Sequence, residues 1–177
     1  HKLPNDWRAG SDAAYWIPLV GLYTGARLSE IAQLTSGDIQ TNAGIPLLII
    51  TNEGERQQVK TAAAIRKIPI HMELIKLGFL DYVARIKNSQ HLSLWPHLPK
   101  RRGKPGGHFS NWFSQWRSTL NLYEVDFHSF RHTVRSQLAN KDISEPIIDA
   151  LLGHQARGSI GATVYTHISL AKLNDAI

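Results

Sequence analysis

The chain has no cysteine among its 177 residues. This absence excludes disulfide frameworks and zinc sites built on thiolates, and it agrees with a reducing compartment. Long apolar runs are missing too: no stretch reaches the roughly 20 residues that cross a bilayer, and the polar opening over residues 1–6 is no secretory signal. Internal repeats and low-complexity tracts are also absent. We therefore expect a soluble cytoplasmic protein, folded as one domain over residues 1–177.

Positive charge, by contrast, is abundant. The 20 lysines and arginines outnumber the 14 acidic residues, which gives a net charge of +6 with the nine histidines neutral. Such a balance favours a polyanionic partner, although an evenly charged, solvated surface would show the same excess. Part of the charge is concentrated between chain breakers in the segment Lys-Arg-Arg-Gly-Lys over residues 100–104. This segment predicts an exposed basic loop.

Apolar residues recur at helical spacing through most of the chain. Over residues 11–33 the pattern predicts two helices that meet at Thr24-Gly25-Ala26. Ser144 is the expected N-cap of one later helix and Gly153 its expected stop. In the last helix, one apolar face can pack on its own core or dock on a neighbouring protomer. The later helices are expected over residues 71–87, 109–120, 128–140, 145–152 and 169–177, with the apolar face of the last made by Leu170, Leu173 and Ile177.

A short β-branched stretch over residues 46–51 predicts a strand, and residues 57–60 and 65–70 are further extended candidates. A hairpin turn is expected over residues 52–55. The fold class is therefore mainly α with a small three-stranded antiparallel sheet.

Several polar residues have an ordinary structural explanation when each is taken alone. Arg27 and Glu30 can form a surface pair three residues apart on a helix. His154 follows Leu-Leu-Gly and can simply interact with free carbonyls at a helix end. Tyr165 can be an ordinary half-buried tyrosine.

The joint pattern is more specific than its parts. Gly-Ala-Arg-Leu-Ser-Glu from Gly25, His-Ser-Phe-Arg-His-Thr from His128, Leu-Leu-Gly-His ending at His154, and Tyr165 eleven residues later occur in this order. Their order and spacing resemble the catalytic domain of the tyrosine recombinases, the phage integrase family. The resemblance spans nearly the whole chain and implies that family's catalytic-domain fold. It also implies a site-specific recombinase that cleaves and rejoins DNA through a 3′-phosphotyrosine intermediate.

In this family a lysine on a β-hairpin completes the site. Lys60, in Val-Lys-Thr, looks like its equivalent, although Lys67 is also near. The expected catalytic residues are therefore Arg27, Lys60, His128, Arg131, His154 and Tyr165.

The reaction explains why these residue types are needed. Negative charge builds on the phosphate oxygens as a nucleophile adds, and the planar forks of Arg27 and Arg131 suit that charge. His154 would add a further donor to the same oxygens.

Protons must also be moved during the reaction. Tyr165 attacks only after it loses its proton, and His128 is the candidate base. Lys60 is the candidate acid for the leaving sugar hydroxyl. Glu30 is expected to orient its neighbours rather than to react.

The resemblance also implies partners. Religation uses the energy of the covalent intermediate, so we expect no cofactor and no metal site. Double-stranded DNA is the expected partner, which places the protein on the nucleoid, and the full-length protein is expected to act as a homotetramer on two DNA sites. Nothing here corresponds to the family's N-terminal core-binding domain, so we expect a monomeric catalytic fragment. The residues expected to grip phosphates are Lys100, Arg101, Arg102 and Lys104.

Three alternatives remain. A catalytically inactive DNA-binding or assembly protein of the same fold would tolerate loss of signature residues, yet none is missing. A metal-dependent hydrolase using His128 and His132 would need the His-Glu-x-x-His pattern, but Ser129 follows His128. A type IB topoisomerase-like strand transferase shares the nucleophile and the arginine clamp. The compact size and the short spacing from Leu-Gly-His to Tyr165 favour the recombinase.

Overall fold

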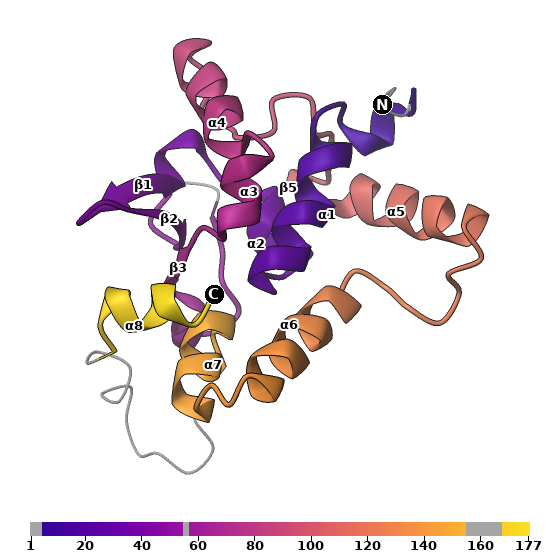
Figure 1. Cartoon of the computed structure of the whole chain (residues 1–177). Helices are drawn as coiled ribbons and strands as arrows, with labels where there is room; N and C mark the ends of the chain where they lie inside the picture. The colour runs from indigo at the N-terminus through magenta and orange to yellow at the C-terminus, as the bar shows by residue number, and fades with distance from the viewer. Residues whose placement is uncertain (1–4, 55–56, 155–167) are drawn as a thin grey trace.

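The computed structural model of the chain describes residues 5–54, 57–154 and 168–177. Helices surround a small sheet, with α5 on the opposite side of the molecule from that sheet (Figure 1). The mainly helical class with a three-stranded antiparallel sheet is confirmed. The described elements are η1 Trp7–Ala9, α1 Ala13–Thr24, α2 Leu28–Ala32, η2 Ser36–Asp38, β1 Ile39–Asn42, β2 Ile45–Ile50, η3 Ala62–Ala64, β3 Arg66–Pro69, α3 Met72–Lys76, α4 Phe79–Asn88, β4 Lys100–Arg101, β5 Lys104–Pro105, α5 Gly107–Thr119, α6 Ser129–Asn140, α7 Glu145–Leu152 and α8 Leu170–Asp175.

The core is built around α1, whose apolar residues pack against aromatic side chains of α4 and of the loop that follows α4. Trp16 of α1 lies against Phe79 and Tyr82, with ring centroids 5.2 and 5.5 Å apart. Tyr82 donates its hydroxyl to the Leu94 carbonyl at 2.7 Å, and the Trp95 indole donates to the Ile31 carbonyl at 2.7 Å. The polar groups of Tyr82 and Trp95 thus have partners within the core, and the Trp95 bond attaches the loop after α4 to α2.

The expected break between the first two helices is present. Gly25 ends α1 in the left-handed region, with φ +63°, and its N–H donates to the Gly21 carbonyl. The Thr24 side chain accepts from the Ala26 N–H at 3.1 Å. These contacts turn the chain sharply and direct Arg27 into the start of α2.

Two of the three expected strands are confirmed and the third is wrong. The sheet has the order β1-β2-β3, with Ile39 opposite Leu48 and Ile50 opposite Arg66. Residues 57–60 form no strand, and the predicted hairpin turn at 52–55 joins no pair of strands in the part of the chain that the structure describes. The hairpin turn instead lies at Ala43 and Gly44, which both have positive φ.

The misplaced strand has a physical explanation. The segment 57–60 is mostly polar, and its glutamines bind other parts of the chain. Gln57 Nε2 donates to Asp38 Oδ2 at 2.7 Å, and the Gln58 N–H donates to Gln33 Oε1 at 2.9 Å. These side-chain bonds replace the ladder bonds of a strand.

The single helix expected over residues 71–87 is also wrong, because Gly78 divides it into α3 and α4. Gly78 has φ +87°, and its N–H donates to the Ile75 carbonyl at 2.9 Å. Glycine adopts this conformation at no steric cost, so it ends α3. The expected helices over 109–120, 128–140 and 145–152 are confirmed within two residues at each end.

The ends of α7 match expectation in position but not in detail. Ser144 occupies the N-cap position, although its side chain makes no capping hydrogen bond. Gly153 stops the helix in the left-handed region, with φ +68°.

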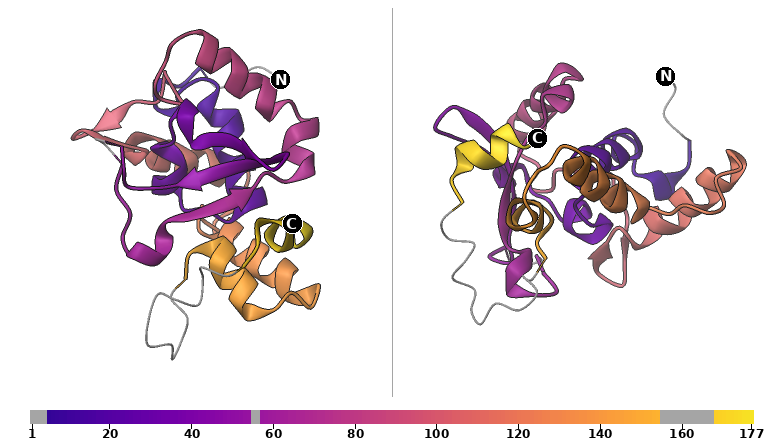
Figure 2. Two further views of the ribbon diagram at one scale, coloured as in Figure 1. Left: turned by 90° about the vertical axis from the view of Figure 1, so that its left-hand side faces the viewer. Right: turned by 60° about the horizontal axis from the view of Figure 1, so that its bottom comes forward.

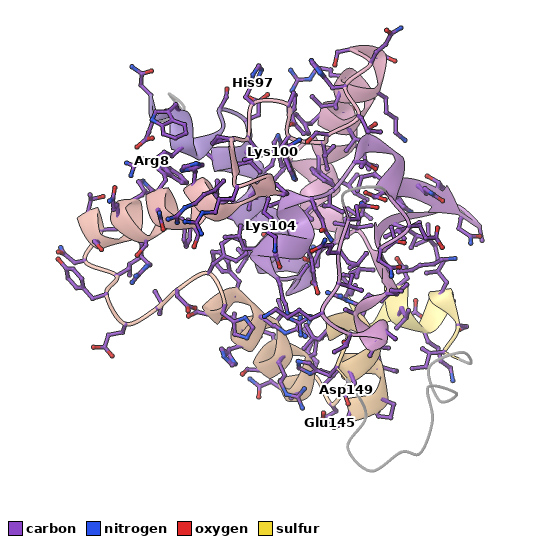
Figure 3. All side chains as sticks on the ribbon, turned by 180° about the vertical axis from the view of Figure 1, so that it is seen from behind. Arg8, His97, Lys100, Lys104, Glu145 and Asp149 are labelled. Carbon is purple, nitrogen blue, oxygen red and sulfur yellow. The ribbon has the colours of Figure 1, made fainter. Side chains whose placement is uncertain are left out.

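The segment 100–104 is exposed, as expected, and forms a two-stranded hairpin of β4 and β5. Its turn residues, Arg102 and Gly103, have φ values of +51° and +76°. Figure 3 shows Lys100 and Lys104 near the N-terminal end of α5.

Helix α8 packs on its own chain. It lies beside α7 and β3 (Figures 1 and 2), and Leu173 and Ala176 are buried there. Of the two hypotheses for this apolar face, packing on the chain's own core is the one observed. None of the helices within the described ranges is long and apolar enough to cross a membrane.

Candidate active site

Three parts of the chain meet at the candidate site: the turn after α1, the first turns of α6, and the end of α7. Arg131 lies in α6, is only 3% exposed, and joins the other two parts. Its Nη1 donates to the Gly25 carbonyl at 2.9 Å, and its Nη2 donates to the Leu152 carbonyl. One guanidinium therefore holds together the two loops that carry Arg27 and His154.

Glu30 lies beneath this turn and accepts bonds from two arginines. Arg27 Nη1 is 2.7 Å from Glu30 Oε1, and the Arg27 N–H donates to Oε2 at 2.9 Å. Arg66 Nη2 is 2.9 Å from the same Oε2. The expected pair of Arg27 and Glu30 forms, but Glu30 is buried, with 3% exposure, rather than at the surface.

The ionisation of Glu30 follows from these contacts. Burial alone would raise the pKa of its carboxyl, but the Arg66 charge and the hydrogen bonds from Arg66 and Arg27 together outweigh burial and lower that pKa. Glu30 is therefore a charged, fixed carboxylate, as an orienting residue requires.

Arg66 was not singled out by the sequence. It faces inward from β3 and is buried, and its Nε and Nη1 donate at 2.8 Å to the Leu151 and Ala64 carbonyls. One sequence signal could have found it. Arg66 lies two positions before the apolar Ile68, so strand alternation places both side chains on the inward face.

His128 and Arg27 line one cavity of about 310 Å³ beside α5. His128 occupies the N-cap position of α6 without a capping side-chain hydrogen bond, and its ring meets that of His132 edge to face, with centroids 5.0 Å apart. Partial burial, followed by the charges of His132 and Arg131, lowers the pKa of His128. The expected neighbours Arg27 and His128 are therefore brought together, and the imidazole is neutral at pH 7.

His154 is held from the side by α6 and α7. Its Nδ1 is 3.2 Å from Arg135 Nη1 and 3.3 Å from Asp149 Oδ1. Burial and the Arg131 charge lower the pKa of His154, against the opposing effect of Asp149. Arg135, which also pairs with Glu145 at 2.6 Å, was missed by the sequence although it lies one helical turn beyond Arg131.

Of the two remaining expected residues, only Lys60 lies within the described part of the chain. Lys60 is exposed, in the connection between β2 and β3 just before η3, rather than in a strand. Lys67 is exposed on β3, on the opposite face of the strand from the buried Arg66. Tyr165 lies outside the described residues, as does the rest of residues 155–167.

Positive charge at the site is not balanced. Within the described ranges, Arg27 and Arg66 pair with the buried carboxylate of Glu30 and Arg131 lies within its electrostatic influence, so three guanidinium groups surround this one buried carboxylate. The other nearby carboxylates, Asp126 and Asp149, act on His128 and His154. Burial and the neighbouring Arg27 and Arg66 charges lower the pKa of Arg131 to about 10, which still leaves it charged at neutral pH. Among the described residues, no group of three His, Asp or Glu side chains could hold a metal ion. The arrangement is suited to binding an anion.

Comparisons with known proteins identify the family and the fold of the chain. Residues 13–171 match the phage integrase family. A tyrosine recombinase of Agathobacter rectalis is 25% identical over 158 residues, which is 87% of this chain and 47% of that protein.

Two solved structures share the fold. The Tn1549 transposon integrase in complex with transposon right end DNA has a TM-score of 0.58 and 22% identity, over 82% of this chain and 52% of that one. The XerH site-specific recombinase bound to its difH substrate has a TM-score of 0.56 and 16% identity, over 85% of this chain and 41% of that one. The chain thus spans about half the length of the proteins it matches.

Proposed function

Because the chain belongs to the phage integrase family, we propose that it is the catalytic domain of a site-specific DNA recombinase that works through a 3′-phosphotyrosine intermediate. The observation that carries the proposal is the contact set of Arg131. This buried guanidinium bonds to the turn that precedes Arg27 and to the turn that precedes His154. The guanidinium groups of Arg27 and Arg131 together carry more positive charge than the carboxylate of Glu30 balances. Such a fixed surplus of positive charge suits a phosphate that becomes more negative during reaction.

In the proposed reaction, the Tyr165 oxygen attacks phosphorus while the bond from phosphorus to the 5′-oxygen breaks. The tyrosine proton passes to His128, whose lowered pKa keeps it neutral and able to accept. The departing 5′-oxygen takes a proton from Lys60, on the exposed connection before η3. The reverse steps rejoin a strand, so the chemistry needs no ATP and no metal ion.

The positively charged residues stabilise the transition state. Each terminal nitrogen of Arg131 carries two N–H groups and gives one to a carbonyl, which leaves the others for phosphate oxygens. Arg27 is the more exposed partner of Glu30, with a quarter of its side chain accessible, and can turn donors toward DNA. His154 contributes a further donor, with Glu30 as the fixed counterion.

We also propose double-stranded DNA as the partner, bound by the exposed hairpin of Lys100, Arg101, Arg102 and Lys104. The DNA bound by the related Tn1549 integrase and XerH recombinase supports this partner. We propose further that residues 1–177 form a single catalytic domain. This domain would be part of a longer protein that forms a tetramer on DNA.

The test uses nicked suicide duplexes with a randomised core, incubated with the chain in EDTA. We expect a covalent protein–DNA adduct that is lost in Tyr165→Phe and kept in the control Tyr123→Phe, because Tyr123 is two-thirds exposed in the connection between α5 and α6. Cleavage abolished by EDTA would support a metal enzyme instead. DNA binding without any adduct would support an inactive binding protein.

A further inference from the structure

The guanidinium of Arg66 lies beneath the candidate site, at a position for which the sequence analysis predicts no functional residue. Arg66 begins β3 opposite Ile50 of β2 and is 8% exposed, whereas its neighbour Lys67 is exposed. The strand therefore turns Arg66 inward, on the opposite face from Lys67, and all three of its nitrogens donate to groups of the protein.

The donors of Arg66 reach two distant segments, α2 and the end of α7, and the η3 turn that leads into its own strand. Nη2 meets Glu30 Oε2 at 2.9 Å, Nε meets the Leu151 carbonyl at 2.8 Å, and Nη1 meets the Ala64 carbonyl at 2.8 Å.

Each of these segments carries a proposed catalytic residue. Glu30 holds both the backbone N–H and the side chain of Arg27. Leu151 lies three residues before His154, and Ala64 lies four residues after Lys60. The three catalytic residues are thus connected to one another through Arg66.

The backbone of Gly153 rests directly on this guanidinium. A Cβ added at Gly153 would lie 2.8 Å from Arg66 Nη1 and 3.1 Å from both the Ala63 carbonyl oxygen and the Ala64 Cα. Real Cβ atoms essentially never show the first of these distances, and the other two are tighter than most, so there is no space for a side chain between the turn before His154 and Arg66.

We propose that Arg66 is a positioning residue, which sets the relative placement of Arg27, His154 and Lys60 around the scissile phosphate without touching DNA itself. This inference rests on the proposed recombinase function. Arginine suits the task because one rigid planar group donates in three fixed directions, whereas a lysine ammonium cannot hold three partners at these spacings.

The inference predicts a specific kinetic signature. Displacement of catalytic groups by about 1 Å can slow a reaction about a hundredfold. Arg66→Lys keeps the charge beside Glu30 but cannot maintain the bonds to both carbonyls. We therefore expect its single-turnover cleavage at saturating protein to fall about a hundredfold, with duplex affinity changed less than about twofold. Arg66→Met should be slower still.

The experiment compares Arg66→Lys, Arg66→Met and the control Arg85→Met on the duplex that the wild-type chain captures. Arg85 lies exposed on α4, so its loss removes the same charge far from the site. If Arg66→Lys does not fold, as judged by circular dichroism, Glu30→Asp replaces it, because the shorter carboxylate draws the same network apart and should give the same signature. Wild-type cleavage by a folded variant, or a loss explained entirely by weaker DNA binding, would overturn the inference.

A second readout needs no DNA and separates this inference from the proposed function. In ¹⁵N-labelled protein, Arg66→Lys should shift the amide signals of Arg27, Lys60 and His154 together, although they lie on three segments. Shifts confined to the neighbours of Arg66 in β3 would overturn the positioning role. Failure of the wild-type chain to capture any duplex would count against the recombinase and leave this spectroscopic test decisive.

Discussion

Arg131 Nη1 donates a 2.9 Å hydrogen bond to the carbonyl of Gly25, a residue 106 positions earlier in the chain. Its other terminal nitrogen donates to the carbonyl of Leu152. The same side chain that is expected to bind phosphate therefore closes the tertiary structure at the site, and the role in stability can be measured separately from the role in catalysis.

Replacing Arg131 with methionine leaves two buried carbonyls without a donor. Each unsatisfied buried group costs about 1 to 3 kcal/mol, so Arg131→Met should lower the free energy of unfolding by about 2 to 6 kcal/mol in urea titrations. The matched control, Arg85→Met, loses only an exposed cation–π contact with the Tyr82 ring and should lower it by no more than about 1 kcal/mol. A loss below about 1 kcal/mol for Arg131→Met would show that these bonds are not important for stability.

Gly153→Ala and Gly44→Ala form a second matched pair. Both glycines have positive φ, at +68° and +79°, but a Cβ at Gly44 meets nothing within 4 Å whereas one at Gly153 meets Arg66. Gly44→Ala should cost about 1 kcal/mol for backbone strain alone. Gly153→Ala should cost about 2 kcal/mol more, because the backbone or Arg66 must shift. Equal losses in thermal or urea unfolding would mean that the Gly153 turn is not tightly seated.

Stability should fall as the pH is lowered, in two steps. The pKa values of His128 and His154 are held below the ordinary 6.5, first by burial and then by nearby positive charge. The unfolded chain then binds more protons than the folded one, so the free energy of unfolding is highest above about pH 6.5 and decreases below it. The lowered pKa of Glu30 has the same sign, and its contribution is present above the ordinary 4.5 and lost further into acid.

Urea titrations across this range check the prediction. His154→Gln should reduce the first decrease and leave the second, whereas the exposed control His97→Gln should change neither. A free energy of unfolding that stays constant from about pH 7 to about pH 5 would contradict the assigned histidine shifts.

The basic hairpin should contribute affinity that depends on salt. Replacing Lys100, Arg101, Arg102 and Lys104 with alanine should weaken binding to all duplexes alike. Each lost phosphate contact should also reduce the slope of log affinity against log salt by about 0.9. Binding measured by fluorescence anisotropy at several salt concentrations checks this. Lys76→Ala, on the exposed α3 pair with Glu73, is the control. An unchanged slope would mean that the side chains of the hairpin are solvated and make no phosphate contacts.

Most of the helices, and the segments of the candidate site, could be predicted from local patterns. Gly25 and Gly153 end helices because glycine adopts the left-handed conformation, and both ends appear where the sequence placed them. The strand over residues 39–42 was missed because Gln-Thr-Asn carries little apolar signal, and its pairing with β2 depends on a turn at Ala43 and Gly44. The prediction of one continuous helix over residues 71–87 was wrong. The apolar residues recur at helical spacing throughout, but Gly78 adopts a left-handed conformation and divides the segment into α3 and α4.

The sequence by itself determined which residue types are present, their order, and the local turns that expose Arg27 and His154. Only the tertiary structure decided that Arg66 and Arg135 support the site, since their partners lie far away in the chain. Arg66 contacts Glu30 and Leu151 across 36 and 85 residues, and no local period encodes such contacts. Burial of Glu30 is likewise a property of packing, and it turns an ordinary helical ion pair into a fixed part of the site.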